Sequence, residues 1–307
     1  MNHSINIINK EDLRYPALLK EIPDAPKKIY VLGELPLDPP ANGPKIAIVG
    51  TRKATDQGKI IAKKLAEKLA NLGVIIVSGL AMGIDTAAHE GAIAAKGKTI
   101  AVLANGLDKI YPAQNENLAK KILEFDGAII SEYEPKTPAY ESQFLERNRI
   151  VSGLSVATIV IEAPERSGSI VTARLAAEQG REVFVFPGPA NHPNYAGSHK
   201  LIRDGARLVS SIEDILEDLK NQFPIFNPPV GGQFSNNFQN SNFQLDKISD
   251  KDQLIIIKTI QKAGQPLNID KIIEITKLEP QIANQAIAFL TIAEIIKETE
   301  KGYIISL

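Results

Sequence analysis

Five short polar segments of the chain have the composition of phosphate-binding turns, and each follows a run of apolar residues. They are Gly50-Thr51-Arg52, Ser78-Gly79, Asn105-Gly106, Glu165-Arg166-Ser167-Gly168-Ser169 and Pro187-Gly188. Glycine lets backbone N–H groups come close to a ligand, and a helix that begins after such a turn adds a partial positive charge. Because two of these turns carry an arginine, the pattern predicts a site for phosphate groups.

Arg52 stands between a predicted strand and a predicted helix. A guanidinium at such a position can form a forked contact with a phosphate that the N–H groups of the turn already hold. The alternative is an ion pair between Arg52 and a carboxylate at the sheet edge, and the sequence leaves both open. We predict that Gly50, Thr51 and Arg52 contact phosphate.

A second candidate turn consists of Ser78, Gly79 and Gly83, and it leads into an alanine-rich helix near Asp85. Its N–H groups and the helix N-terminus would form an anion site. Tight connections between a strand and a helix also need glycine for structural reasons, so that alternative stays open. His89 is four residues after Asp85 on the same helix face, where a side-chain hydrogen bond is expected rather than metal binding.

An aromatic residue within a basic cluster is typical of proteins that bind single-stranded nucleic acid, and Phe144 lies beside Arg147, Asn148 and Arg149. Base stacking on an aromatic side chain is worth about 1–3 kcal/mol per base. In the alternative interpretation Phe144 is a core residue, Arg149 is a buried ion-pair partner and Asn148 caps local backbone. We predict a binding role for all four residues.

The segment Arg166, Ser167, Gly168 and Ser169 precedes a predicted helix, so its N–H groups could hold a further phosphate. Enzymes that process nucleotides use similar turns, and Glu165 could then act as an acid or base. Against an enzyme, the sequence offers no activated nucleophile, no histidine paired to one and no cluster of metal ligands. We therefore predict no catalytic residue, no metal and no cofactor.

The elements that position these residues follow a strand–helix rhythm. Apolar runs predict strands at 46–49, 74–77, 99–103, 128–131, 158–161 and 183–186. Helical patterns between them predict helices at 56–72, from 85 onward, and at 115–125, 145–151 and 169–179. Such alternation predicts the α/β class with a doubly wound parallel sheet, whose ligands bind beyond the carboxyl ends of the strands. The polar segments fall at those ends.

The composition is that of a globular protein of 307 residues, with 44% hydrophobic residues, 23% charged residues and a formal net charge of −1. The arginines are unevenly placed, since eight of nine lie between Arg52 and Arg207. A local phosphate-binding face is therefore possible in a nearly neutral protein. The absence of cysteine excludes disulfides and thiolate chemistry. No signal peptide or membrane span is expected, so we expect a cytoplasmic protein.

Composition shifts divide the chain into four parts. Residues 1–43 are a short lead-in that packs on the core, residues 44–222 form the α/β domain, and residues 223–245 form a flexible linker rich in Asn, Gln and Phe. Residues 246–307 show three helical patterns and two strand-like runs, as in a winged helix. No Lys or Arg occurs between Leu278 and Ile296, which favours protein docking over duplex reading.

The same segments, taken together with their neighbours, resemble a known family. The matching blocks are Ile48 to Arg52 with Thr55 and Gly58, Ser78 to His89, Leu107 to Pro112, Ser131 to Tyr133, Phe144 with Arg147 to Ser155, Glu165 to Ser169 with Thr172, Ala173 and Ala176 to Gly180, and Leu201 to Ala206. In this order and spacing they resemble the DNA-processing protein A family over most of the first 216 residues.

The resemblance implies an extended Rossmann-like domain that binds single-stranded DNA, works as a homodimer and has no enzymatic activity. It implies a role in natural transformation, in which incoming strands are protected and the recombinase RecA is loaded onto them. No cofactor or metal is implied. The alternative is a nucleotide-binding enzyme or sensor of a related fold, similar to phosphoribohydrolases.

Some features depart from the family pattern. Many members carry an additional N-terminal helical domain, for which residues 1–43 are too short. Ala104 stands where glycine is common, the stretch 143–146 replaces a common Asn-Phe-Pro sequence, and the stretch 194–199 differs in spacing. None of these removes a predicted site residue, but Glu146 adds negative charge beside the site.

Overall fold

The computed structural model describes residues 4–38, 43–220, 251–263, 266–292, 295–299 and 302–305. The chain divides into two compact units, Met1–Asn227 and Pro228–Leu307. The predicted linker 223–245 lies outside the described residues, so the division of the chain into four parts stays a prediction. Within the described ranges, no helix has both the length and the apolar composition that crossing a membrane requires.

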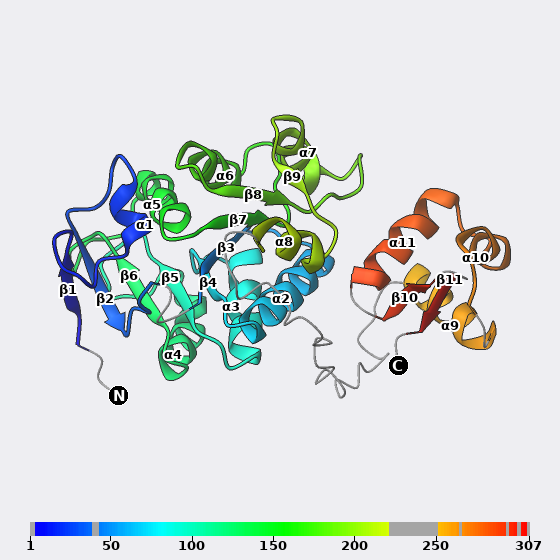
Figure 1. Ribbon diagram of the computed structural model, residues 1–307, viewed down its shortest axis with the longest axis horizontal. Helices are drawn as coiled ribbons and strands as arrows, with labels where there is room; N and C mark the ends of the chain where they lie inside the picture. The colour runs from blue at the N-terminus through cyan, green and yellow to red at the C-terminus, as the bar shows by residue number, and fades with distance from the viewer. Residues whose placement is uncertain are drawn as a thin grey trace. The chain divides into compact units, whose positions relative to one another are not determined.

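The first unit is built on one nine-stranded sheet with the order β1-β2-β6-β5-β4-β3-β7-β8-β9 (Figure 1). Its strands are β1 (Asn6–Asn9), β2 (Lys28–Gly33), β3 (Lys45–Val49), β4 (Ile75–Ser78), β5 (Thr99–Val102), β6 (Ala128–Ser131), β7 (Ala157–Val160), β8 (Glu182–Val185) and β9 (Arg207–Leu208). Strands β3 to β9 pair in parallel, whereas β2 and β1 extend the sheet antiparallel beyond β6. The predicted α/β class with a doubly wound parallel sheet is confirmed.

Helices cover both faces of this sheet. One face carries α1 (Ala17–Glu21), α5 (Glu141–Gly153), α6 (Gly168–Glu178) and α7 (Ala196–Arg203), and the other carries α2 (Asp56–Asn71), α3 (Ile84–Ala94), α4 (Glu116–Glu124) and α8 (Ile212–Leu219). Alternation along β3 explains the two layers, because Ala47 and Val49 join the first core while Ile46 and Ile48 join the second. A strand that is buried on both faces must be apolar throughout.

The two edges of the sheet were missed by sequence reasoning. The lead-in contributes β2, and the edge strands β1 and β9 are only four and two residues long. Such short segments carry no periodic pattern, and their partners β2 and β8 make them strands.

The order of the strands creates a topological switch between β3 and β7. From β3 the chain builds β4, β5 and β6 on one side, and β7 returns to the other side of β3, followed by β8 and β9. Connections that leave two adjacent strands in opposite directions open a crevice beyond their carboxyl ends. The turn after β3 contains Arg52, and the turn after β7 contains Arg166, so two predicted phosphate-binding turns flank this crevice.

The second unit has the elements of a winged helix. They are α9 (Lys251–Ala263), α10 (Ile269–Thr276), α11 (Pro280–Ile292), and an antiparallel pair of β10 (Ile296–Thr299) and β11 (Gly302–Ile305). All five were predicted. In α11, Ala283, Ile287 and Leu290 are buried, whereas Gln281 and Asn284 are exposed. The face that α11 exposes therefore carries no cation, and protein docking by this unit stays a prediction.

Candidate nucleic-acid interface

A pocket of about 640 Å³ opens at the carboxyl ends of the strands beside the β3–β7 switch. Eleven of the fourteen predicted binding residues line it, and they come from four separate segments of the chain: Gly50, Thr51, Arg52, Gly79, Phe144, Arg147, Asn148, Arg166, Ser167, Gly168 and Ser169. Three predicted residues, Ser78, Gly83 and Arg149, do not line it. The fold thus brings most of the sequence-predicted residues into one concave surface.

Arg52 and Phe144 are in contact at this pocket. The guanidinium carbon of Arg52 lies 5.0 Å from the centre of the Phe144 ring, within the range of a cation–π interaction. Arg52 is exposed, and no ion pair between described residues includes it. The carboxylate partner that the sequence left open is therefore not found among the described residues, and Arg52 can meet an external phosphate.

Tyr111 is a third member of this group that sequence reasoning missed. Its ring centre lies 5.4 Å from that of Phe144 at an interplanar angle of 55°, and its side chain is 46% exposed. Both residues line the pocket, so two aromatic rings face it together. The signal that could have found Tyr111 is its place directly before Pro112, in the loop that follows β5.

The charges of the pocket wall are unbalanced in favour of cations. Arg52, Lys53, Arg147 and Arg166 line it, against the carboxylates of Asp85 and Glu141. Arg52, Lys53 and Arg166 are also exposed. A chain with a formal net charge of −1 therefore has a locally positive cleft, which attracts anions.

Helix α6 begins at the pocket wall. The Ser167 hydroxyl caps it by accepting from Ser169 N at 3.3 Å, and Asn148 Nδ2 donates to Gly168 O at 3.2 Å. A Cβ on Gly168 would meet only Asn148, at 3.8 Å, so the pocket side of this residue is open. The exposed N-terminus of α6 adds a partial positive charge to the wall.

The glycine turn after β4 binds an internal anion, which corrects the expectation of an external anion site there. The carboxylate of Asp85 accepts from Gly79 N at 3.0 Å and from Ala81 N at 3.4 Å. Burial raises the pKa of Asp85, while the charge of Arg147 and the two amide donors act in the opposite direction. The turn is therefore filled by the protein's own carboxylate.

Ser78 and Gly83 also have structural roles. Ser78 is fully buried and its hydroxyl donates to Ile48 O at 2.7 Å. Gly83 has a φ of +84°, and a Cβ there would lie 2.4 Å from Thr51 O. The expectation that these residues contact the ligand is corrected, because both pack against the β3 end of the sheet.

Arg147 lines the pocket but is almost fully buried. Its side chain is 4% exposed and it donates to Gly79 O at 2.7 Å and to Val102 O. A Cβ on Gly79 would lie 2.5 Å from this guanidinium, which explains the glycine. Burial lowers the pKa of Arg147 to about 10, while Asp85 acts in the opposite direction. Arg147 stays charged at neutral pH and positions the β4 turn, and its contact with a phosphate stays a prediction.

Arg149 and the Asp85–His89 pair also differ from expectation. Arg149 pairs with Glu132 at 2.6 Å, which is the ion-pair alternative that the sequence left open. His89 Nδ1 contacts Thr99 Oγ1 at 2.7 Å, and Thr99 Oγ1 donates to Ile76 O, so Nδ1 carries the proton. The expected hydrogen bond between Asp85 and His89 is wrong. Burial, with a contribution from the charge of Arg147, lowers the pKa of His89 to about 3.

The enzyme alternative requires an available acid or base at the pocket. Glu162 is fully buried and accepts from Thr55, Asn194 and Tyr195. Glu165 is exposed and does not line the pocket. Glu165, which the sequence offered for this chemistry, therefore does not face the site, and neither does Glu162.

Comparison with known proteins decides the family. The model of the family described as DNA recombination-mediator protein A matches residues 6–220. The chain belongs to this family. Protein Smf of Escherichia coli (strain K12), a relative, is 44% identical over 219 residues, which cover 71% of this chain and 57% of that protein. DNA processing protein DprA of Bacillus subtilis (strain 168) is 44% identical over 215 residues, covering 70% of this chain and 71% of that protein. The chain thus spans little more than half the length of the Escherichia coli relative.

Solved structures of relatives have the same architecture. DNA processing protein A from Streptococcus pneumoniae matches with a TM-score of 0.64 at 41% identity, covering 72% of this chain and 75% of that one. The Helicobacter pylori protein matches with a TM-score of 0.63 at 32% identity, covering 72% and 98%, and is described as having a unique single-stranded DNA binding mode. The matched family region, 6–220, contains every pocket residue of the chain.

Proposed function

We propose that the chain is a recombination mediator that binds single-stranded DNA in the pocket beside the β3–β7 switch. The observation that carries this proposal is the group of Arg52, Phe144 and Tyr111, in which a free guanidinium lies over one of two neighbouring aromatic rings. Family membership and the single-stranded DNA mode of the Helicobacter pylori relative support it. Arg52 is the central ligand-contacting residue of the proposal.

The proposed contacts divide between backbone and base. Arg52, Lys53 and Arg166 meet phosphates, together with the N–H groups at the start of α6. Phe144 and Tyr111 offer ring surface to an unstacked base. In a duplex the faces of the bases are already stacked on each other, so this arrangement favours a single strand over a duplex.

Further parts of the proposal rest on the family alone. They are protection of incoming strands in natural transformation, loading of RecA, homodimer formation, and the absence of enzymatic activity, metal and cofactor. A nucleotide-binding enzyme on the same edge is the competing function. The burial of Glu162 and the internal bonding of Asp85 disfavour it, because neither of these two carboxylates is free to act as an acid or base on a ligand.

Fluorescence anisotropy with a labelled oligothymidine tests the proposal, with a duplex of equal length as competitor. We expect Arg52→Ala to weaken binding at least tenfold and to reduce the slope of log K against log salt by about 0.7, the value for one phosphate contact on a single strand. Arg174→Ala is the matched control, because Arg174 lies on α6, is 54% exposed and does not line the pocket. Equal binding by both variants would refute the proposal, and turnover of a nucleoside monophosphate would favour the enzyme.

A further inference from the structure

Glu162 is the most buried carboxylate near the pocket, yet it does not line it. It lies two residues beyond the end of β7, the strand that adjoins β3 at the switch. We propose that Glu162 is a positioning residue that holds the Arg52 turn in its DNA-binding conformation. This inference rests on the function proposed above and assigns a role to a residue that contacts no ligand.

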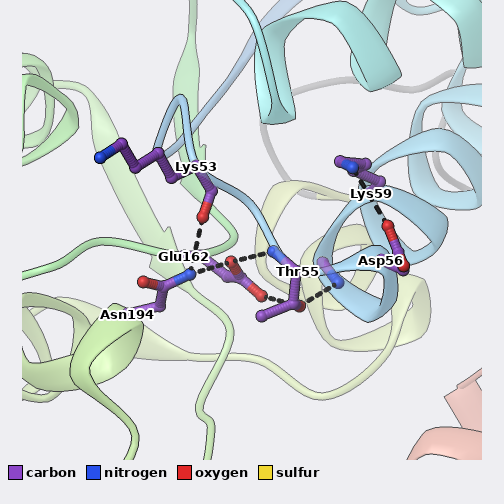
Figure 2. Close-up of polar contacts among 7 residues, drawn as sticks. Lys53, Thr55, Asp56, Lys59, Glu162 and Asn194 are labelled. Carbon is purple, nitrogen blue, oxygen red and sulfur yellow. Dashed lines mark hydrogen bonds and ion pairs between the residues drawn. The ribbon is translucent and has the colours of Figure 1, made fainter. Parts of the chain in front are cut away.

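The carboxylate of Glu162 is saturated by donors from two distant segments. Oε2 accepts from Thr55 N at 3.0 Å and from Asn194 Nδ2 at 2.9 Å. Oε1 accepts from Thr55 Oγ1 and from Tyr195 OH at 3.0 Å. Figure 2 shows Thr55 and Asn194 converging on Glu162 from opposite sides. Burial raises the pKa of Tyr195, and the charge of Glu162 raises it further, so the phenol remains a donor.

These bonds tie down the backbone on both sides of Arg52. On its C-terminal side, Lys53 O accepts from the same Asn194 side chain at 3.0 Å, and Thr55 is held by the carboxylate itself. On its N-terminal side, Thr51 N donates to Glu162 O at 2.8 Å. The turn that carries Arg52 is therefore attached to Glu162 through Thr51 and Thr55, and through Asn194 at Lys53 O.

The start of α2 depends on the same residue. Thr55 Oγ1 donates to Glu162 and accepts from Gly58 N at 2.9 Å, so the helix cap and the carboxylate form one chain of hydrogen bonds. A Cβ on Gly58 would lie 2.4 Å from Glu162 Oε1, so only glycine lets the helix approach the carboxylate this closely. The Thr55 cap, Gly58 and the Glu162 carboxylate therefore fix the point at which the Arg52 turn ends and α2 begins.

A turn that is already ordered loses less conformational freedom when its side chain binds. If the Glu162 bonds are lost, Lys53 and Thr55 can move, and the Arg52 guanidinium no longer has a defined position over Phe144. In Glu162→Gln, an amide NH₂ replaces one oxygen and faces two donors, so one side of the hydrogen-bond set is lost while the volume is kept. The fold should tolerate Glu162→Gln better than a substitution by a smaller residue, which would leave a cavity.

The test measures oligothymidine binding of the full chain by anisotropy, well below the unfolding temperature of each variant. We expect Glu162→Gln to weaken binding about tenfold. The double variant with Arg52→Ala should bind no more weakly than Arg52→Ala alone, because Glu162 acts through Arg52. Asp214→Asn is the stability control, since it removes part of the remote α8 cap formed with Ser211, and it should leave binding unchanged.

Wild-type affinity in Glu162→Gln, or losses that multiply in the double variant, would overturn the inference. If Glu162→Gln does not fold, Asn194→Ala decides in its place, because it removes the donor shared by Glu162 and Lys53 O. We expect Asn194→Ala to weaken oligothymidine binding about threefold, and to have no further effect when Arg52→Ala is already present. An affinity of Asn194→Ala equal to that of the wild type would overturn the inference. If Arg52→Ala bound oligothymidine as tightly as the wild type, the proposed function itself would be refuted.

Discussion

Gly83 gives a sharp test of how the pocket wall is built. A glycine beside a binding site can serve the ligand or the packing of the protein, and the structure assigns Gly83 to packing. Its φ of +84° and ψ of −122° lie outside the regions that L residues favour. A Cβ would lie 2.4 Å from Thr51 O and 2.7 Å from Arg52 O, both backbone atoms that cannot swing aside.

Two terms set the size of the effect of Gly83→Ala. The backbone conformation costs about 1–3 kcal/mol for a residue with a Cβ. Forcing extra volume against the Arg52 turn costs about 1–3 kcal/mol more. We therefore expect a free energy of unfolding lower by about 2–6 kcal/mol.

Gly180→Ala is the matched control. Gly180 also has a positive φ, +70°, but nothing lies within 4 Å of a Cβ built there. Only the backbone term remains, about 1–2 kcal/mol. In circular dichroism melts, Gly83→Ala should have a lower Tm than Gly180→Ala. The difference in Tm should be at least about 2–4 °C for each kcal/mol that the steric contact of the added Cβ costs. The same samples should show weaker oligothymidine binding for Gly83→Ala alone.

Equal melting temperatures for the two variants would refute the packing argument. So would a Gly83→Ala protein that melts like the wild type but fails to bind DNA, because the glycine would then serve the ligand directly, as the sequence first indicated.

Three further predictions follow from the buried groups and the second unit. Arg147→Met should lower the free energy of unfolding by about 3–5 kcal/mol in urea titrations, because Asp85 loses its buried counter-charge; a change below about 1 kcal/mol would contradict the assigned role. His89 has a pKa of about 3 in the folded state. Below the pKa of His89 in the unfolded chain, only the unfolded state binds the extra proton, so the free energy of unfolding decreases as the pH is lowered. The loss between pH 7 and pH 5 should be about 2 kcal/mol, and should be absent in His89→Gln. Deletion of residues 246–307 should leave oligothymidine affinity within tenfold, and a larger loss, above about 1.4 kcal/mol, would show that the charge argument for this unit fails.

The elements of the fold were largely readable from the chain. Continuous apolar runs and helical spacing place the six central strands and the helices between them, because each pattern reports which faces of a segment are buried. The same reasoning missed β1 and β9, whose four and two residues become strands only through their neighbours. It also named the polar turns without showing that β3 and β7 are adjacent.

The candidate site was readable by residue type but not by role. Arg52, Arg147 and Arg149 look alike in the sequence, yet one is exposed over Phe144, one is buried against two carbonyls and one pairs with Glu132. Tyr111 was overlooked because its ring partner Phe144 is 33 positions away.

By itself, the sequence determined the α/β class, the order of the elements and the set of polar turns at the strand ends, because these depend on local periodicity and residue type. The tertiary structure alone decided how those turns are arranged around the pocket. Asp85 fills the glycine turn, and Glu162 reaches Thr55 across 107 positions of the chain. The partners of a buried charge are set by strand order and packing, and no local pattern in the sequence encodes them.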